Sequence, residues 1–238
     1  MSRQRRIRLY IEGSIEVKTP IYLDQEQKNY LLKVMRCRVG EEIKIFNQLY
    51  GEWIGMINNL YITPISKIRE PEPEPEQKIV LCFAPTKKYG EFSVEKATEA
   101  GVHCIIPIKT ERSIVDKINL SRYKKAMLEA AEQCGRVDLP KLTDLIDLKN
   151  LKKHIIEMYS EEEPLFIVCD INKGINDFKK LKDIRIICII VGPEGGFGEK
   201  DYIIFNELSV SYLGLGDNVL RAETASITSV AVIKHLIS

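Results

Sequence analysis

The chain has 238 residues, of which 45% are hydrophobic, so it can bury one large core or two smaller ones. Its net charge of +1 does not by itself indicate a nucleic-acid partner. No apolar run reaches the length of a membrane span and no signal-peptide core follows the basic start, so we expect a cytoplasmic protein with no membrane partner. Six scattered cysteines without a C-x-x-C pair argue against disulfides, and three separated histidines predict no metal site.

The amino-terminal part has the pattern of a small, mostly β domain. Short strands are expected at Ile7–Ile11, Glu41–Phe46 and Trp53–Ile57, with a helix beginning after Asp24. Basic residues outnumber acidic ones over residues 1–40, which indicates either a phosphate-binding surface or an ordinary solvated one. The basic residues there are Arg3, Arg5, Arg6, Arg8, Lys18, Lys28, Lys33, Arg36 and Arg38.

Proline and glutamate then alternate from Pro71 to Glu76. Proline is excluded from helix and sheet interiors, and neighbouring like charges repel, so this tract should extend as polyproline II. Residues 71–77 are therefore predicted to link a first domain at 1–70 to a second at 78–238. Their carboxylates are expected to face solvent.

Beyond the linker, predicted strands and helices alternate. The expected strands are Ile79–Ala84, Cys104–Ile108, Leu165–Cys169 and Ile186–Val191, and the expected helices are Phe92–Gly101, Arg122–Cys134, Leu142–Lys153 and Ile227–Ile237. Alternation of this kind is typical of βαβ units and a parallel sheet. The run from Ile186 to Val191 is continuous and β-branched, which favours a strand covered on both faces. The sequence thus predicts an α/β fold.

Two glycine-rich turns near the carboxyl end are the main candidates for a binding site. One is Gly192–Gly198, which follows the buried strand, and the other is Leu213–Gly216. Glycines let backbone N–H groups approach a ligand with no Cβ in the way. Their spacing fits neither common nucleotide motif, and Glu194 disfavours phosphate, so a cationic or hydroxyl-bearing ligand is expected. A tight turn without a ligand is the alternative.

Several segments together resemble one enzyme family. They are GPEGGFGEKD at 192–201, LGDNVLRAETA at 215–225, EKATEAGV at 95–102, ERS at 111–113 and EAAEQCGR at 129–136, with a weaker match at 31–39. These motifs resemble the SPOUT class of S-adenosylmethionine-dependent RNA methyltransferases. Within that class they are similar to the bacterial family that methylates N3 of a uridine in 16S ribosomal RNA. The sequence departs from the family pattern at Tyr30, at Ala100 and around 86–90.

The resemblance implies a PUA-like β-barrel domain that helps to grip RNA, followed by a SPOUT methyltransferase domain with a deep trefoil knot. It also implies bound S-adenosylmethionine, a homodimer, and 16S rRNA in the small ribosomal subunit as the partner. In such an enzyme Arg221 would stabilise negative charge on the uracil oxygens, and Glu223 and Thr224 would orient it or help remove a proton. The implied cofactor residues are Cys169, Gly192, Gly195, Leu213, Leu215, Gly216 and Leu220, and the implied RNA contacts are Arg36, Arg112, Gln133 and Arg136.

Some of these residues also have structural explanations. Arg221–Thr224 fits a helix N-terminus, and Gly135 with Arg136 fits a helix C-terminus. Arg36 and Arg112 fit exposed charges, and Asp201 is expected to be only a helix-start carboxylate. Two other functions stay open: a SPOUT methyltransferase acting on tRNA or on a ribose 2′-oxygen, and a non-catalytic RNA-binding factor in ribosome assembly.

Overall fold

The computed structural model describes residues 7–160, 163–171 and 181–238, which form two compact units. Unit 1 comprises Met1–Glu74 together with Ala131–Leu139, and unit 2 comprises Pro75–Ala130 together with Pro140–Ser238. Unit 1 therefore includes a segment from the middle of the chain, which the sequence did not indicate. Arg3, Arg5 and Arg6 of the expected basic surface lie outside the described residues.

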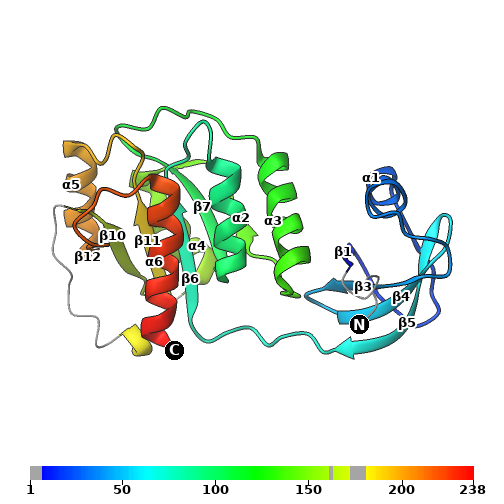
Figure 1. The fold of residues 1–238 in the computed structure, drawn as a ribbon. Helices are drawn as coiled ribbons and strands as arrows, with labels where there is room; N and C mark the ends of the chain where they lie inside the picture. Colours follow the sequence, from blue (N-terminus) through cyan, green and yellow to red (C-terminus); the bar gives the residue numbers. More distant parts are fainter. Residues whose placement is uncertain (1–6, 161–162, 172–180) are drawn as a thin grey trace. The chain divides into compact units, whose positions relative to one another are not determined.

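Unit 1 is built on a curled five-stranded sheet with the order β1-β3-β4-β5-β2 (Figure 1). β1 is parallel to β3, and the other neighbours are antiparallel. The predicted strands of the amino-terminal part are all present, so its mostly β character is confirmed. The five strands are β1 (Arg8–Tyr10), β2 (Ile21–Tyr22), β3 (Glu42–Asn47), β4 (Gly51–Ile57) and β5 (Tyr61–Arg69).

A short helix contributes to the hydrophobic core of unit 1. Asp24 caps α1 (Gln25–Lys28): its Oδ1 accepts the backbone N–H of Gln27 at 2.8 Å. The chain continues as a π-helix, η2 (Asn29–Val34). Leu31 of η2 is fully buried in a core that also contains Leu9, Ile43, Ile45, Ile57 and Ile62.

Arg8 is a buried cation that ties the 131–139 segment to β1. Its Nε donates to Glu52 Oε1 at 2.6 Å, and its Nη1 and Nη2 donate to the carbonyl oxygens of Ala131 at 2.5 Å and Arg136 at 2.9 Å. Arg8 is only 7% exposed, and its guanidinium carbon lies 4.0 Å from the ring centroid of Phe46. The last carbonyl groups of a helix have no N–H donor within the helix, and here the buried guanidinium of Arg8 supplies these donors.

Unit 2 contains a parallel sheet with the order β12-β10-β11-β6-β7-β8, in which β9 also pairs with β7. Every residue of β11 is at most 2% exposed, as expected for a strand covered on both faces. The predicted parallel sheet is confirmed. Its strands are β6 (Lys78–Phe83), β7 (Cys104–Lys109), β8 (Lys141–Leu142), β9 (Ile146–Asp147), β10 (Leu165–Cys169), β11 (Ile186–Val191) and β12 (Ser211–Leu213).

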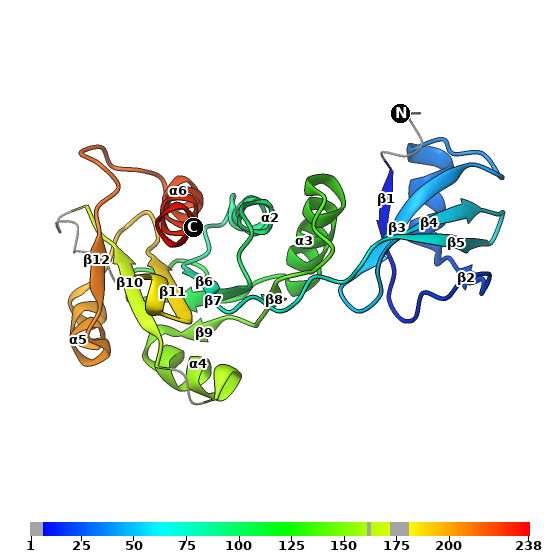
Figure 2. The same ribbon diagram turned by 90° about the horizontal axis from the view of Figure 1, so that it is seen from below.

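Helices cover both faces of this sheet (Figure 2). The helix α6 packs against α2, β6 and β11 on one face. On the other face, Leu151 of α4 and Phe205 of α5 share a core with Cys82 and Ile190 of the sheet. The helices of the first face are α2 (Gly90–Ala100), α3 (Leu120–Cys134) and α6 (Ala222–Ile237), and those of the second are α4 (Leu151–Tyr159) and α5 (Glu199–Leu208).

The helix predicted at Leu142–Lys153 is wrong over most of its length. Lys141 and Leu142 instead form β8, and Ile146 pairs with Ile108 of β7 as part of β9. A 3₁₀ turn, η3 (Leu148–Asn150), then leads into α4. The edge of β7 offers backbone groups that need partners, and pairing with them prevails over the local helical pattern.

The predicted fold class, a parallel α/β domain of SPOUT type preceded by a small PUA-like β domain, is confirmed, whereas the trefoil knot stays a prediction. A second 3₁₀ turn, η4 (Leu181–Asp183), precedes β11. The Pro-Glu tract is exposed from Glu72 to Glu76, as expected. Among the described helices, none has the length and apolar character needed to cross a bilayer.

Candidate active site

Three neighbouring strands of unit 2 end at the same edge of the sheet and enclose a cavity. β10 lies between β11 and β12, and the loops that follow all three strands contribute to the cavity wall. Its volume is about 350 Å³. Open α/β sheets bind ligands at the carboxyl ends of their strands, so this is the expected location for a site.

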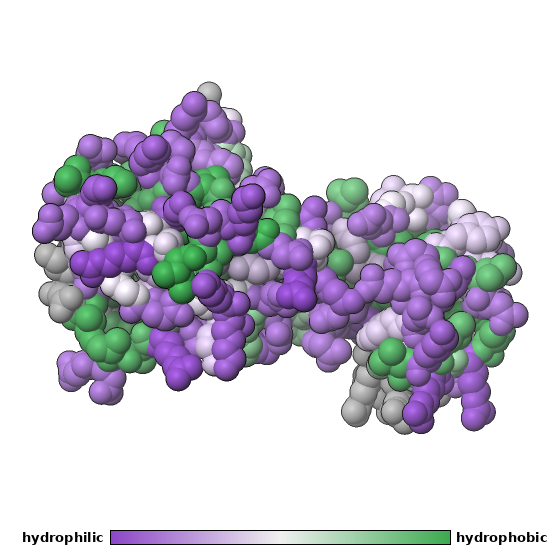
Figure 3. Space-filling view, turned by 90° about the horizontal axis from the view of Figure 1, so that it is seen from above, coloured by the Kyte–Doolittle hydropathy of each residue, from purple (hydrophilic) through white to green (hydrophobic). Residues whose placement is uncertain are grey.

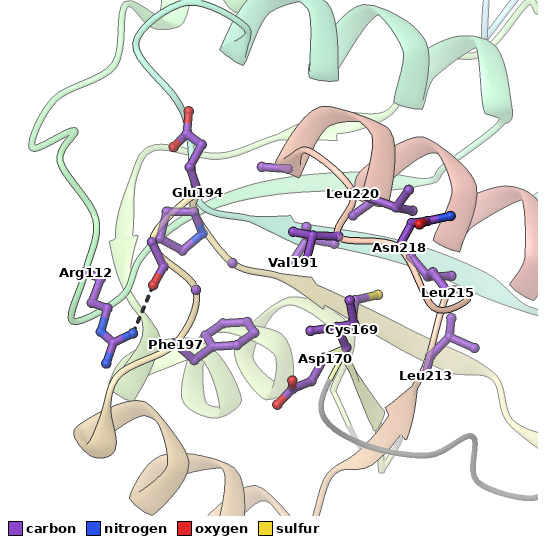
Figure 4. A pocket seen from close by; sticks show the side chains of 18 of the residues that line it. Arg112, Cys169, Asp170, Val191, Glu194, Phe197, Leu213, Leu215, Asn218 and Leu220 are labelled. Atoms are coloured by element: carbon purple, nitrogen blue, oxygen red, sulfur yellow. Dashed lines mark hydrogen bonds between the residues drawn. The ribbon is translucent and has the colours of Figure 1, made fainter.

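The cavity brings together residues from the two glycine-rich turns and from the end of β10 (Figure 4). All seven residues predicted to contact a cofactor line it, and Arg112 lines it as well. Figure 4 shows aliphatic side chains grouped at one end, with Glu194 and Arg112 toward the other. Which ligand atoms these residues contact stays a prediction. The seven residues are Cys169, Gly192, Gly195, Leu213, Leu215, Gly216 and Leu220.

The first glycine turn needs at least two of its glycines for steric reasons. A Cβ added to Gly192 would lie 3.0–3.2 Å from three ring atoms of Phe197, closer than most side-chain contacts. Gly196 has φ +68°, and its N–H donates to Pro193 O at 2.9 Å, closing the turn. The turn is therefore held in one shape by its own sequence.

A second loop, Thr110–Ser113, is hydrogen-bonded to this turn and to the start of α5, and we call this set of bonds the clasp. Arg112 Nη1 donates to Gly195 O at 3.0 Å, and Glu111 Oε2 accepts the N–H of Lys200 at 2.9 Å. Asp201 connects the two segments, because its oxygens accept the N–H of Gly198 at 2.8 Å and that of Glu111 at 3.0 Å. Asp201 is 2% exposed. It starts helix α5 as expected, but it also holds the two loops together, which sequence reasoning missed.

Asp170 supplies buried negative charge beside the cavity. Its side chain is 8% exposed and accepts a hydrogen bond from the hydroxyl of Tyr202 at 2.6 Å. Burial raises the pKa of Tyr202 to about 12, and the bond to Asp170 acts on that pKa in the same direction. Tyr202 is therefore a neutral donor at physiological pH. Glu194 adds an exposed carboxylate to the cavity wall.

Cys169 lies in the cavity wall as a neutral thiol. Burial raises the pKa of Cys169 to about 12, and a hydrogen bond with Ser229 lowers it only in part. A thiol is a nucleophile only as its thiolate. Cys169 therefore contributes a soft apolar surface to the cavity rather than a reactive group.

The three residues predicted to act in catalysis lie at the start of α6, next to the cavity: Arg221 is the N-cap residue, and Glu223 and Thr224 are in the first turn. Ala222 and Ala225 of this turn line the cavity, whereas Arg221, Glu223 and Thr224 do not. Arg221 Nη1 lies 3.4 Å from the hydroxyl of Tyr89 and 4.0 Å from Glu223 Oε1. Glu223 is 7% exposed, and Thr224 is exposed. Their catalytic roles stay predictions.

Of the four predicted RNA contacts, Arg112 belongs to unit 2 and the other three belong to unit 1. Arg36 is exposed and has φ +56°, an uncommon conformation for a residue other than glycine. Gln133 is exposed at the end of α3. Arg136 is 11% exposed and already pairs with Asp138, with contacts of 2.5 and 3.1 Å. An RNA phosphate would have to compete with that carboxylate.

Two residues near the site had no signal in the sequence. Tyr202 lies within α5, and Tyr89 precedes α2 in a segment that departs from the family pattern. The Tyr89 ring centroid lies 5.9 Å from the guanidinium carbon of Arg221. The proximity of the two tyrosines to the site comes from the tertiary fold, which periodicity does not reveal. Asn218 also lines the cavity, and it lies within the motif at 215–225.

Comparison with known proteins places the chain in a family. A family model described as RNA methyltransferase domain matches residues 72–234, and one described as RNA methyltransferase PUA domain matches residues 23–63. The chain belongs to this RNA methyltransferase family. The motif-based prediction of the family is thereby confirmed.

Two curated relatives and one solved structure extend this RNA methyltransferase assignment along the chain. A ribosomal RNA small subunit methyltransferase E of Rickettsia conorii is 29% identical, with 96% of this chain and 95% of the relative covered. One of Mesomycoplasma hyopneumoniae is 30% identical, with 87% and 94% covered. The crystal structure of a ribosomal RNA small subunit methyltransferase E of Neisseria gonorrhoeae, bound to S-adenosyl methionine, is 26% identical with a TM-score of 0.79 and 97% of each chain covered.

Proposed function

We propose that the protein methylates N3 of a uridine in 16S rRNA of the small ribosomal subunit, with S-adenosylmethionine as methyl donor. The observation that carries the proposal is the cavity where β10, β11 and β12 end, lined by all seven expected cofactor residues. Two findings support it: curated relatives are named for small-subunit rRNA methylation, and the similar Neisseria structure is bound to S-adenosyl methionine.

The cavity suits this cofactor in size and chemistry. Its volume of about 350 Å³ lies within the usual range of small-ligand sites, roughly 300–1,000 Å³. Leu213, Leu215 and Leu220 offer apolar surface to an adenine ring. The glycine turns offer backbone groups to the nucleoside and to the amino-acid end. The carboxylates of Asp170 and Glu194 favour a ligand that carries positive charge.

When bound, S-adenosylmethionine supplies an electrophilic methyl group on a positively charged sulfur. The protein must then provide a uracil that has lost its N3 proton. Loss of this proton spreads negative charge onto O2 and O4 of the ring. The guanidinium of Arg221 keeps its charge at neutral pH and can donate to such an oxygen, which stabilises the developing anion.

Glu223 and Tyr89 restrict the position of Arg221. The carboxylate of Glu223 lies 4.0 Å from Arg221 Nη1, and the Tyr89 hydroxyl lies 3.4 Å from the same atom. We assign the buried Glu223 to orienting Arg221. Thr224 is exposed on the same helix turn, and we assign it to passing the N3 proton to solvent. The reaction would then balance: N3 loses one proton and gains the methyl group, while the bond from that methyl to sulfur breaks and its electron pair stays on the sulfur as a neutral thioether.

The remaining expectations complete the proposal. Residues 1–70 would form an RNA-binding domain and residues 78–238 the methyltransferase domain, joined at 71–77. Arg36, Arg112, Gln133 and Arg136 would contact RNA, with Arg112 also holding the cofactor turn through Gly195. The protein would act in the cytoplasm, where small subunits are assembled.

The proposed homodimer is supported by apolar side chains at the carboxyl end of unit 2. Val219 is 83% exposed and Leu236 of α6 is 39% exposed. Exposed apolar residues beside a site are readily covered by a second subunit. Sedimentation equilibrium should give twice the mass of one chain at micromolar concentration, and a monomer at that concentration would contradict this part of the proposal.

The decisive experiment is methyl transfer to small ribosomal subunits that lack the modification, with naked 16S rRNA and tRNA in parallel. Labelled S-adenosylmethionine is used, and the RNA is digested to nucleosides for chromatography and mass spectrometry. We expect 3-methyluridine from the small subunit. A 2′-O-methylated nucleoside or labelled tRNA would establish the other methyltransferase function instead. Saturable cofactor binding without transfer to any RNA would indicate a non-catalytic assembly factor.

A further inference from the structure

A second cavity in unit 2 is not used by the chemistry above. It is formed by residues from 86–91, which run from the loop after β6 into the first turn of α2, and by residues from 114–123, which run into the first turn of α3. Its volume is also about 350 Å³. We call it the lysine cleft, after Lys87, Lys88 and Lys117 in its wall.

The lysine cleft carries positive charge that nearby carboxylates do not neutralise. Two acidic residues line it, but Glu91 lies 3.4 Å from Arg122, and Asp116 lies 2.5 Å from Lys109 outside the cleft. In the part of the chain that the structure describes, the three lysines form no ion pair with an acidic residue. A concave site with this charge favours a polyanion.

Tyr123 adds a hydroxyl that has no partner among the described residues. The residue is 5% exposed, its ring stacks on Phe83 at 6.4 Å, and it lines the cleft. The ring is buried, and the hydroxyl at the cleft wall is a donor that a ligand oxygen can accept from. Gly90 leaves room for this hydroxyl, since a Cβ there would lie 2.0 Å from the Tyr123 oxygen.

Two elements connect the lysine cleft to the candidate active site. Tyr89 lies within the 86–91 turn, where its N–H donates to Thr86 Oγ1 at 3.1 Å, and its ring faces Arg221 at 5.9 Å. The segment after β7 contributes Arg112 to the cofactor cavity and residues 114–119 to the cleft. Figure 3 looks onto this end of unit 2, which is mostly hydrophilic with a few hydrophobic groups.

We infer that the lysine cleft holds the sugar–phosphate unit next to the target base when RNA is bound. Lys87 and Lys117 contact the phosphate, and the Tyr123 hydroxyl donates to a phosphate or ribose oxygen. Backbone contacts of this type fix the register of a nucleic acid without reading its sequence. With its backbone held in the cleft, the RNA directs the adjacent base toward Arg221, past the neighbouring Tyr89. The inference rests on the proposed function and specifies how its RNA substrate is positioned.

The test uses the full-length protein and a fluorescently labelled single-stranded oligoribonucleotide, with binding followed by anisotropy over a range of salt concentrations. The double variant K87A/K117A should bind more weakly, and its salt slope should fall by roughly 0.7 for each phosphate that is no longer neutralised. Y123F should lose roughly threefold to tenfold in affinity with the salt slope unchanged. Because the Tyr123 hydroxyl bonds no described protein group, Y123F should keep the wild-type melting temperature.

K152A serves as the matched control, since Lys152 is an exposed lysine on α4, on the opposite face of the sheet. S-adenosylmethionine affinity and the KM for small subunits are measured for every variant. The cleft variants should raise KM while leaving cofactor affinity within twofold. Wild-type affinity and slope in K87A/K117A would overturn the inference, as would an equal loss of RNA affinity in K152A. A wild-type protein that binds RNA through the cleft yet methylates no 16S rRNA would instead refute only the proposed function.

Discussion

Arg221 is the residue on which the proposed chemistry depends most. Its side chain is 71% exposed, yet Tyr89 and Glu223 both lie within 4.0 Å of its Nη1 atom. A charged group held in place before the reaction costs little reorganisation when negative charge develops, which makes it effective in catalysis. Its neighbours Ala222 and Ala225 line the cavity of the candidate active site, but Arg221 itself does not.

We therefore expect Arg221→Ala to separate binding from turnover. The single-turnover rate of methyl transfer should fall by roughly 100-fold or more, as when one oxyanion donor is removed. Calorimetry should give a cofactor affinity within twofold of wild type. Arg221→Lys retains charge but not the planar fork, so it should recover part of the rate. Equal loss of rate and cofactor affinity in Arg221→Ala would make Arg221 a structural residue.

Cys169 allows a prediction of pH dependence. Burial raises the pKa of Cys169 from the ordinary 9.0 to about 12. Between these two pH values the thiol stays protonated in the folded protein, whereas it ionises in the unfolded chain. This contribution to stability is present below pH 9 and is lost as the pH rises toward 12. Iodoacetamide at pH 8 should modify exposed Cys134 and spare Cys169, as mapped by peptide mass spectrometry. Rapid alkylation of Cys169 at pH 8 would show that its thiol is not shielded.

Much of the candidate site could be predicted from sequence, because its glycines and leucines occur in two contiguous turns with recognisable motifs. Gly192 and Leu215 are examples. Tyr202 and Tyr89 could not be predicted, since each reaches the site only through the packing of a helix or a helix start against another element. Asp201 was predicted at a helix start, but its second bond to Glu111, 90 positions away, has no local signal.

Among the structural elements, the clasp around the first glycine turn gives the most direct test. Asp201→Ala would leave the N–H groups of Gly198 and Glu111 without their acceptor in a buried place. We expect a loss of about 1–3 kcal/mol in the free energy of unfolding and weaker cofactor binding. Thermal unfolding and calorimetry measure the two effects.

Glu207→Ala is the matched control for this element, since Glu207 is exposed in the last turn of the same helix. It should change stability by less than about 0.5 kcal/mol. A stable Asp201→Ala variant with normal cofactor affinity would show that the clasp does not shape the cavity.

The strands that sequence reasoning missed depend on pairing with a neighbouring strand. β5 contains Pro64, which ordinarily argues against a strand. It is tolerated here because the register between β4 and β5 shifts at Gly55, the residue paired with Pro64. β8 and β9 are two residues each and exist only because the edge of β7 is available. By contrast, β11 and α2 have strong local signals, and Gly101 ends α2 at φ +87°.

For the whole molecule, Arg8 is a buried residue that joins distant parts of the chain within unit 1. Arg8→Ala would leave the buried Glu52 with Lys44 as a remaining partner, and it would remove the donors to the end of α3. Breaking a buried ion pair costs about 3–5 kcal/mol when the other charge is left unpaired, so with Lys44 still in place we expect a loss toward the lower end of that range. Urea unfolding should show that loss, and limited proteolysis should cut near residues 131–139 sooner than in wild type.

Lys44→Ala is the comparison for Arg8→Ala. Lys44 pairs with the same carboxylate at 3.1 Å, but its side chain is 31% exposed. Its removal should cost less than about 1 kcal/mol, because a partly solvated pair contributes little. Similar losses in the two variants would mean that the bonds of Arg8 to Ala131 and Arg136 add nothing.

The bond from Arg8 to Ala131 spans 123 positions. Protein synthesis proceeds from the amino terminus, so β1 leaves the ribosome long before its partner segment exists. Unit 1 of the nascent chain therefore cannot complete its folding until residue 139 has emerged, because the carbonyl groups of Ala131 and Arg136 that Arg8 bonds are synthesised late. During that interval a chaperone has more opportunity to bind the amino-terminal strands than their short length suggests.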